Sequence, residues 1–291
     1  MRVAVIGKSG QLARCLAGNV PAGVECVCLG RAQLDIGSAK PVFDALTSHC
    51  PDLVINASAY TAVDKAESDR EAAFALNELG AARLAEFAAA HNIPLIHVST
   101  DYVFDGVSSR PYTEDDATAP LNVYGESKLA GERAVARIWH AHIIVRTSWL
   151  FSAWGSNFVK TMLRLGAGSG SLRVVADQYG RPTSAHELAN VLWAIAMRVG
   201  SASSPAGHWG IYHYAEDGVT NWAEFAEAIF ASPHAGRAET PQVQKIGTVD
   251  YSTPARRPRN SVLDCSKIKR VFGIRPKPWT QSLSDVLQKI Q

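Results

Sequence analysis

Short, almost wholly apolar runs alternate with longer Ala- and Leu-rich stretches through the first half of the chain. The apolar runs predict strands at 3–7, 25–30, 52–58, 94–100 and 142–148. The stretches between them predict helices near 11–19, 38–49, 68–91 and 123–137. Because these strands are apolar on both faces, helices should cover both faces of a parallel sheet. The alternation therefore predicts an α/β fold with a Rossmann-like, doubly wound parallel sheet.

The pattern weakens after about residue 150. The elements predicted there are a strand at 172–177, a helix at 185–199, a Gly/Ser/Pro loop over 199–210, a short strand near 210–215, a helix near 221–232, a surface loop over 231–241, a basic Pro-rich stretch at 253–264 and a terminal helix. We expect residues 1–150 to form the doubly wound domain, with segments from about 155–200 returning to it. Residues 151–291 should form mainly a smaller, mixed C-terminal lobe.

Charge and cysteine content exclude several functional classes. The chain has 29 basic and 27 acidic residues, so its net charge of +2 gives no global field that favours nucleic acid or membrane as a partner. The longest helix-like apolar run, VLWAIAMRV, is too short to cross a bilayer, and no secretory signal pattern precedes the first strand. Five scattered cysteines favour reduced thiols in a cytoplasmic protein, and no His or Cys spacing resembles a zinc site.

A glycine turn joins the first predicted strand to the first predicted helix. The sequence GKSGQLA places Gly7 and Gly10 in this turn, where backbone N–H groups can approach a pyrophosphate at the helix N-terminus. Many strand–helix turns use glycine for geometry alone, so the pair by itself is a weak signal. Its position at the first junction of an α/β chain makes dinucleotide binding the favoured interpretation, and we expect the C-terminal lobe to bind the substrate.

The end of the second predicted strand bears on the choice between NAD and NADP. The chain reads Leu29-Gly30-Arg31 there, with no carboxylate to bind a ribose 2′-hydroxyl. An arginine suits a 2′-phosphate, which favours NADPH; the weaker alternative is that Arg31 is a solvated loop residue, and the use of NADH stays open. Asp35 and Ile36 follow closely and are candidates to meet the adenine.

Tyr124 and Lys128 are four residues apart on a predicted helix, which places them on one face. Roughly one chain in four of this composition would show such a pair by chance, so the spacing alone is weak. Thr100, however, lies at the end of the fourth predicted strand, at the sheet edge where ligands bind. Its hydroxyl can hold a carbonyl oxygen while the phenol protonates it. We expect the lysine ammonium, together with a positively charged nicotinamide ring nearby, to lower the tyrosine pKa from about 10.

Several longer motifs resemble the extended short-chain dehydrogenase/reductase superfamily over nearly the whole chain: NASAYTAVDKAE, STDYVFDG, PLNVYGESKLAGE, RTSWLF, DQYGRPTSA and RRPRNSVLD. The resemblance is to the branch that acts on dTDP-linked keto-deoxysugars. It implies NADPH-dependent reduction of the 4-keto group of dTDP-4-dehydro-L-rhamnose to dTDP-L-rhamnose, a precursor of cell-surface polysaccharide. Another dTDP-4-keto-6-deoxyhexose as substrate, and a non-catalytic regulatory subunit on the same fold, remain the alternatives.

The resemblance also implies roles for individual residues. Thr100, Tyr124 and Lys128 would form the catalytic set. The cofactor would lie against Gly10, Gln11 and Leu12 in the glycine turn, against Ala59, Tyr60 and Thr61 after the third strand, and against Tyr124 and Lys128.

The substrate would meet Thr100, Asp101 and Trp149. Asp101 could instead cap a turn, and Trp149 could be a core residue. One of the arginines 256, 257 and 259 would grip the substrate diphosphate, and Arg257 is our candidate. The same stretch could be a solvated basic face.

Some members of this superfamily branch form metal-bridged dimers through acidic residues, but Cys15 and His186 occupy the matching positions here, with Glu187 adjacent. We therefore expect no metal site, doubt a magnesium requirement, and expect a monomer or an ordinary homodimer. Glu126 and Glu132 are interpreted as helix surface.

Overall fold

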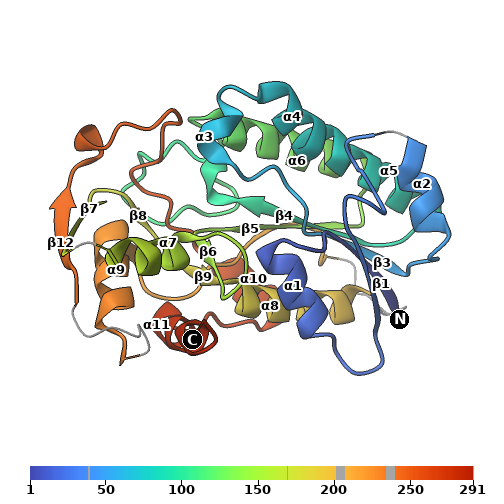
Figure 1. The fold of residues 1–291 in the computed structure, drawn as a ribbon. Helices are drawn as coiled ribbons and strands as arrows, with labels where there is room; N and C mark the ends of the chain where they lie inside the picture. The colour runs from blue at the N-terminus through green and yellow to red at the C-terminus, as the bar shows by residue number, and fades with distance from the viewer. Residues whose placement is uncertain (39, 169, 201–206, 234–239, 291) are drawn as a thin grey trace.

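Six parallel strands form the central sheet, in the order β10-β5-β4-β3-β1-β2. The computed structural model describes residues 1–38, 40–168, 170–200, 207–233 and 240–290 (Figure 1). The strands of the sheet are β1 Arg2–Ile6, β2 Glu25–Leu29, β3 Leu53–Asn56, β4 Leu95–Thr100, β5 His142–Thr147 and β10 Gly210–His213. The parallel, doubly wound architecture predicted from the apolar runs is confirmed.

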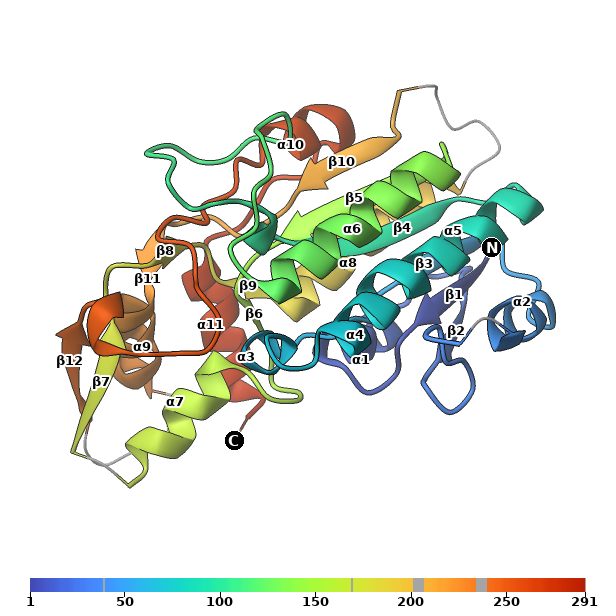
Figure 2. The ribbon, with the colours of Figure 1, turned by 90° about the horizontal axis from the view of Figure 1, so that it is seen from above.

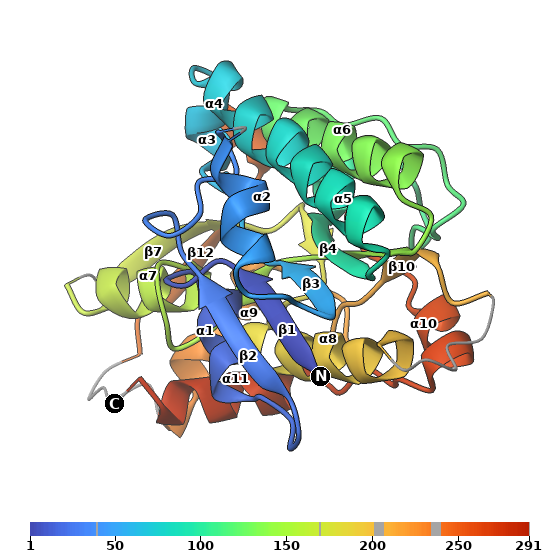
Figure 3. The same cartoon turned by 90° about the vertical axis from the view of Figure 1, so that its right-hand side faces the viewer.

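Helices cover both faces of the sheet because neighbouring strand residues point to opposite sides. In β1, Val3 and Val5 join one buried cluster, whereas Ala4 and Ile6 join another. The first cluster is covered by α1 (Gln11–Gly18), α8 (Ala185–Val199) and α10 (Ser266–Phe272). The second is covered by α2 (Lys40–Thr47), α5 (Gly80–His91) and α6 (Val123–Ile138). Figure 3 shows the sheet between these two layers.

The helix predicted over 68–91 is interrupted by a wider turn. It consists of α4 (Arg70–Phe74), a π-helical segment η1 (Ala75–Leu79) and α5, preceded by the short α3 (Val63–Ala66). The π-helical segment buries Asn77 against α6, where a Cβ at Gly131 would overlap the Asn77 carbonyl oxygen. Glycine at position 131 therefore lets the two helices approach closely.

The lobe contains a second, smaller core. Strands β7 (Ser171–Val175) and β12 (Gln242–Ile246) pair in parallel and pack with α7 (Phe158–Gly166), α9 (Trp222–Ala231) and α11 (Trp279–Gln288). Figure 2 shows this group beside the carboxyl ends of the main strands. Two short strand pairs complete it: β6 (Leu150–Phe151) with β9 (Thr183–Ser184), and β8 (Tyr179–Gly180) with β11 (Thr220–Asn221).

Two features differ from the expected organisation. The strand near 210–215, grouped with the lobe from sequence, is β10, and it pairs with β5 at the edge of the main sheet. Strand β12 was missed because its side chains are mostly exposed and give no apolar run. Of the loop expected over 231–241, residues 234–239 lie outside the described residues, as do 201–206 of the loop over 199–210.

Among the described helices, none combines the length and apolar character needed to cross a membrane. The described residues also contain no group of three or more His, Cys, Asp or Glu side chains that could hold a metal ion. Cys15 is 6% exposed in the core beneath α8 and offers no surface ligand for a bridging ion. The expectation of no magnesium-bridged dimer stays a prediction.

Candidate active site

The chain reverses its winding between β1 and β3. From β1 it passes through α1 to β2 at one edge, whereas from β3 it proceeds through β4 and β5 toward the other. Open α/β sheets bind ligands at the carboxyl ends of the strands beside such a switch point. A cleft of about 1350 Å³ lies there, and every residue that sequence analysis assigned to cofactor or catalysis lines it.

The glycine turn after β1 needs glycine for two reasons. Gly7 has φ +124°, and a Cβ there would lie 3.3 Å from Ala13 Cβ and 3.4 Å from the Ala57 carbonyl oxygen. Gly10 is the N-cap of α1, makes no side-chain cap, and has no heavy atom within 4 Å of a Cβ built on it. The turn thus presents backbone N–H groups of α1 to the cleft, a cradle suited to a pyrophosphate.

The side chain of Gln11 lines the cleft and also hydrogen-bonds to residues of the lobe. Its Oε1 accepts hydrogen bonds from Ser152 Oγ and Asn157 Nδ2, both at 2.9 Å. Asn157 is also the N-cap of α7, where its Oδ1 accepts from the Lys160 N–H. Gln11 therefore connects the glycine turn to the first turn of a lobe helix.

The end of β2 forms the far end of the cleft. The Arg31 side chain is 90% exposed, with its Nε 3.7 Å from Asp35 Oδ2, so it is free to turn toward a phosphate. Ile36 is 2% exposed and packs where a Cβ at Gly80 would stand 2.7 Å from its Cδ1. Exposed cationic and buried apolar groups thus lie side by side, as an adenosine phosphate requires.

After β3, the segment Ala59–Thr61 forms a wall of the cleft. The Tyr60 backbone is clamped by Asn77, whose Oδ1 accepts from the Tyr60 N–H at 2.8 Å and whose Nδ2 donates to the Tyr60 carbonyl at 3.1 Å. The Tyr60 hydroxyl donates to Asp69 Oδ2 at 3.0 Å. Buried Asn77 therefore fixes this wall, a role that its place in a predicted helix did not reveal.

The N-terminus of α6 is fixed against the end of β4. Asn122 caps the helix by accepting the Gly125 N–H at 2.8 Å, and a Cβ at Gly125 would overlap the Tyr102 carbonyl oxygen. This close contact brings Tyr124 beside Thr100, which is 5% exposed. The helix spacing then places Lys128 deeper in the cleft, where its Nζ donates to the Val98 carbonyl at 2.7 Å.

Burial controls the protonation of the catalytic set. Desolvation raises the pKa of Tyr124 to about 12, against an opposing hydrogen bond with Thr100. In the protein without cofactor, burial therefore outweighs any lowering of the tyrosine pKa, and the expected joint effect of Lys128 and a nicotinamide ring stays a prediction. Desolvation lowers the pKa of Lys128 to about 8, opposed by the charge of Glu132. At neutral pH the phenol carries its proton, which is the state a proton donor needs.

Asp101 is buried next to the reacting groups. It is 2% exposed, and its Oδ1 accepts the Thr100 hydroxyl at 3.0 Å, while its buried Oδ2 has no partner in the described residues. Burial raises its pKa to about 7, against the opposing effect of the nearby hydroxyls of Ser261 and Thr100. It does not merely cap a turn, because it also orients the Thr100 hydroxyl.

Trp149 lies at the junction of sheet and lobe. It has φ +46°, and its ring stacks on Trp222 with centroids 3.6 Å apart. A Cβ at Gly180 would overlap the Trp149 indole, so the glycine of the DQYGRPTSA motif allows this placement. Phe158 adds a third ring, 4.7 Å from Trp222, and all three side chains line the cleft.

The candidate diphosphate arginine is already paired. Arg257 contacts Asp64 in a two-point ion pair, Nη2–Oδ2 at 2.7 Å and Nη1–Oδ1 at 3.0 Å. It nevertheless lines a second cavity, of about 730 Å³, together with Arg256 and Arg259. This cavity adjoins the catalytic helix, since Asn122 Nδ2 donates to the Arg256 carbonyl at 2.7 Å.

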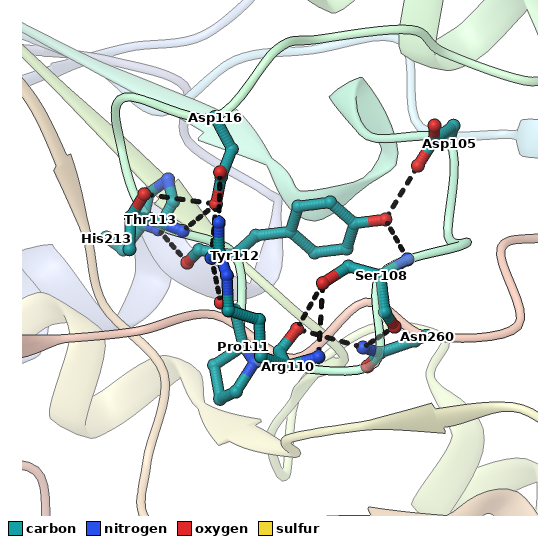
Figure 4. A network of polar contacts seen from close by, with 9 residues as sticks. All are labelled: Asp105, Ser108, Arg110, Pro111, Tyr112, Thr113, Asp116, His213 and Asn260. Carbon is teal, nitrogen blue, oxygen red and sulfur yellow. Dashed lines mark hydrogen bonds and ion pairs between the residues drawn. The ribbon is translucent and has the colours of Figure 1, made fainter.

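The wall of this second cavity is held by its own hydrogen bonds, drawn in Figure 4. The Tyr112 hydroxyl donates to Asp105 Oδ1 at 2.7 Å and accepts the Ser108 N–H at 3.1 Å. Asn260 Nδ2 donates to the carbonyls of Ser108 at 2.8 Å and Arg110 at 3.2 Å. The loop over 105–111 is thereby tied to the basic stretch that follows β12.

Comparisons with known proteins show which family the chain belongs to. A family model described as the RmlD substrate binding domain matches residues 1–291. A dTDP-4-dehydrorhamnose reductase from Sinorhizobium fredii is 46% identical over 282 residues, 97% of this chain and 95% of the relative. The chain belongs to the dTDP-4-dehydrorhamnose reductase family.

Solved structures of this family have the same fold. A dTDP-4-dehydrorhamnose reductase from Clostridium acetobutylicum superposes with a TM-score of 0.91 at 34% identity, over 99% of this chain and 98% of that one. One from Bacillus anthracis, solved in complex with NADP, gives 0.90 at 33% identity over 98% of both chains. As a member of the dTDP-4-dehydrorhamnose reductase family, the protein is a Rossmann-like oxidoreductase.

One sequence interpretation within the family motifs is wrong. The sequence predicts Glu132 on the helix surface, but its side chain is 2% exposed and forms a buried ion pair with Arg146 of β5. Trp222 and Phe158 were also missed, because each lies at the start of a lobe helix whose position relative to β5 no local pattern shows. The Asn residues that precede both, Asn221 and Asn157, are N-caps that local sequence does reveal.

Proposed function

We propose that the protein reduces the 4-keto group of dTDP-4-dehydro-L-rhamnose to give dTDP-L-rhamnose, with NADPH as the reductant. The observation that carries the proposal is the convergence of Thr100, Tyr124 and Lys128 on one cleft with the glycine turn. The high identity to relatives named for this reaction supports the same substrate. A binding-only protein on this fold would have no need of the buried Tyr–Lys pair.

The residues present fit NADPH. The open cradle at Gly10 would hold the pyrophosphate, and exposed Arg31 would meet the 2′-phosphate. Asp35 and Ile36 would lie against the adenine end, and Ala59–Thr61 along the cofactor's length. NADPH, when bound, supplies the hydride for the carbonyl carbon. The NADP complex of the Bacillus anthracis relative supports this choice of cofactor.

The chain's own residues supply the proton. Thr100 and Tyr124 lie beside each other at the carboxyl end of β4, so the Tyr124 hydroxyl can donate to the ketone oxygen, and the Thr100 hydroxyl can do so once it turns from Asp101 Oδ1. As negative charge develops on that oxygen, Tyr124 donates its proton and becomes a phenolate. Lys128, buried one turn away, stabilises this phenolate by its positive charge. The transfer leaves an alcohol on the sugar.

The second cavity would take the nucleotide part of the substrate. Its three arginines suit a diphosphate, and its wall of hydrogen-bonded loop gives a fixed shape. Because Arg257 is held by Asp64, Arg256 and Arg259 are additional candidates for the direct contact. Trp149 and Trp222 would border the deoxysugar between the two cavities.

The test is a reductase assay with the purified protein, NADPH and dTDP-4-dehydro-L-rhamnose, followed by loss of cofactor absorbance. We expect turnover with this substrate and much less with GDP- or UDP-linked keto sugars. A second assay with another dTDP-4-keto-6-deoxyhexose ranks the sugar specificity. Tight binding of substrate and NADPH without any turnover would reject the enzymatic proposal in favour of a regulatory subunit.

A further inference from the structure

The helix that carries Tyr124 and Lys128 buries a third ionisable side chain one turn further on. Glu132 follows Lys128 by four residues, so the two lie on the same face of α6. Its carboxylate contacts Arg146 three times: Nη2–Oε2 at 2.7 Å, Nε–Oε1 at 3.0 Å and Nε–Oε2 at 3.2 Å. Both side chains are almost completely buried, at 2% and 3% exposure.

Arg146 is enclosed on its other sides by neutral groups. Its Cζ lies 5.1 Å from the centre of the Phe104 ring, and its Nη1 lies 3.4 Å from His213 Nε2 on β10. Burial and the Arg146 charge lower the pKa of His213 to about 3, so this imidazole is neutral at neutral pH. Glu132 is therefore the anionic contact of the guanidinium within the described residues.

The three buried charges form a row in which the carboxylate stands between two cations. Lys128 comes first on α6, Glu132 second, and Arg146 of β5 third. A buried ammonium is unfavourable unless an opposite charge compensates it. Without the carboxylate, the Lys128 ammonium would lose the charge that opposes its desolvation, and the Arg146 guanidinium would lose its ion-pair partner. The order of charges thus favours a charged lysine.

The other titratable groups around Lys128 do not supply this compensation at neutral pH. On α6 itself, burial keeps Tyr124 protonated. From β4, His97 is buried, and its pKa is lowered well below the ordinary value by desolvation first and by Lys128 second. Asp101, just after β4, has a pKa raised to about 7 by burial and is partly ionised at neutral pH, but its charge is not among those that shift the pKa of Lys128. Glu132 is the group whose charge opposes the desolvation of Lys128.

We propose that Glu132, clamped by Arg146, is a positioning residue that keeps the Lys128 ammonium charged and directed at the Val98 carbonyl through the working pH range. This rests on the proposed role of Lys128 in reduction. The second glutamate of YGESKLAGE, Glu132, and the arginine of RTSW, Arg146, then act together. The pair sets the electrostatics of the site without touching the substrate.

The test is the pH profile of kcat for Glu132→Gln, with Glu126→Gln as matched control on the exposed side of the same helix. In the wild type, kcat should fall as the pH rises through about 8, where Lys128 loses its proton. Glu132→Gln should lower the pH at which kcat falls by about one unit, because the loss of a neighbouring opposite charge lowers the pKa of an ammonium by about that much. Glu126→Gln should leave this pH unchanged.

A double variant separates positioning from folding. Glu132→Gln alone leaves a buried guanidinium unpaired and can unfold the protein, whereas Glu132→Gln with Arg146→Met removes both charges, a change that buried pairs often tolerate. In the double variant, kcat should also fall at a lower pH than in the wild type. The single variant Glu132→Asp, which keeps the carboxylate, should have the wild-type pH profile. A folded double variant with a wild-type pH profile would overturn the inference.

The outcome for Lys128 itself is independent. If Lys128→Met keeps wild-type turnover, the proposed function of the site fails, whatever the Glu132 variants do. If Lys128→Met is inactive and the Glu132 variants keep the wild-type pH profile, only the positioning role fails.

Discussion

The indole rings of Trp149 and Trp222 lie face to face, with centroids 3.6 Å apart and planes 8° from parallel. Trp149 follows the central strand β5, whereas Trp222 begins the lobe helix α9. The stack is therefore a direct contact between the sheet that carries the reacting groups and the lobe. Both rings border the cleft, so a change in one should reach the sugar through the other.

We expect Trp222→Ala to raise KM for the keto sugar more than it lowers kcat, because the ring supports Trp149 without meeting the ketone. Aromatic pairs contribute about 1 kcal/mol beyond area burial, which is about fivefold in affinity. A double-mutant cycle with Trp149→Phe and Trp222→Phe measures the coupling. Trp154→Phe, at an exposed ring, is the control. Strict additivity of the two substitutions would contradict the prediction.

Tyr124→Phe should reduce kcat by about 10²- to 10⁴-fold, the usual contribution of a positioned general acid. The phenyl ring keeps the buried shape, so the dissociation constant of NADPH should stay nearly unchanged. Turnover and fluorescence titration with NADPH measure the two quantities. Tyr251→Phe, at an exposed tyrosine, should behave as wild type. Normal turnover of the Tyr124 variant would reject the proton-transfer step.

Arg31→Ala tests the reading of the 2′-phosphate. A charge-assisted hydrogen bond is worth about 1.5–3 kcal/mol, so kcat/KM for NADPH should fall about ten- to a hundredfold. The value for NADH should hardly change, since NADH has no 2′-phosphate. Arg173→Ala on β7, an exposed arginine of the lobe, controls for general charge loss. Equal losses with both cofactors would mean that Arg31 does not discriminate them.

The buried Glu216 carboxyl should make the stability of the fold depend on pH, independently of catalysis. Its side chain is fully buried, accepts the Ser184 N–H at 2.7 Å and the Ser282 hydroxyl, and burial raises its pKa from 4.5 to about 7. Because the folded protein binds this proton more tightly, the stabilisation is complete below about pH 4.5 and is lost as pH rises to about 7.

Glu216→Gln stays neutral at every pH; its Oε1 can accept the Ser184 N–H while its Nε2 donates to Ser282 Oγ. Its Tm should therefore exceed the wild-type Tm at pH 8 by more than at pH 4. The difference in unfolding free energy between the variant and the wild type should change by at most about 1.4 kcal/mol per pH unit. Calorimetry across this range provides the measurement, with Glu227→Gln at an exposed glutamate as control. A difference in Tm that does not vary with pH would contradict the assignment.

Gly131→Ala reverses the usual effect of the substitution. In a helix, Gly→Ala normally stabilises by about 1 kcal/mol. Here the methyl group would overlap the Asn77 carbonyl oxygen, so we expect destabilisation by about 1–3 kcal/mol. Gly18→Ala in α1, where a Cβ meets nothing within 4 Å, should be neutral or stabilising. Urea unfolding of the two variants gives the comparison.

The sequence predicted what depends on neighbouring residues. Buried parallel strands are recognisable as apolar runs, and their order with helices led to the switch point where Thr100, Tyr124 and Lys128 meet. It did not predict contacts between distant segments. Trp222 reaches Trp149 only because the start of α9 lies beside the segment that follows β5, and Glu132 looks like any surface glutamate until Arg146 is placed opposite it.

Strand β10 has a consequence for engineering this protein. The sheet is completed by residues 210–213, and one of its faces is covered by α8 and α10, all of them beyond the boundary near residue 150. A fragment that ends at 150 would expose the edge of β5 and the apolar side of β1. The lobe is therefore an insertion assembled from several segments rather than a detachable tail. Grafting a different sugar pocket onto this cofactor-binding sheet would require exchanging those segments individually, with α8, β10 and α10 left in place.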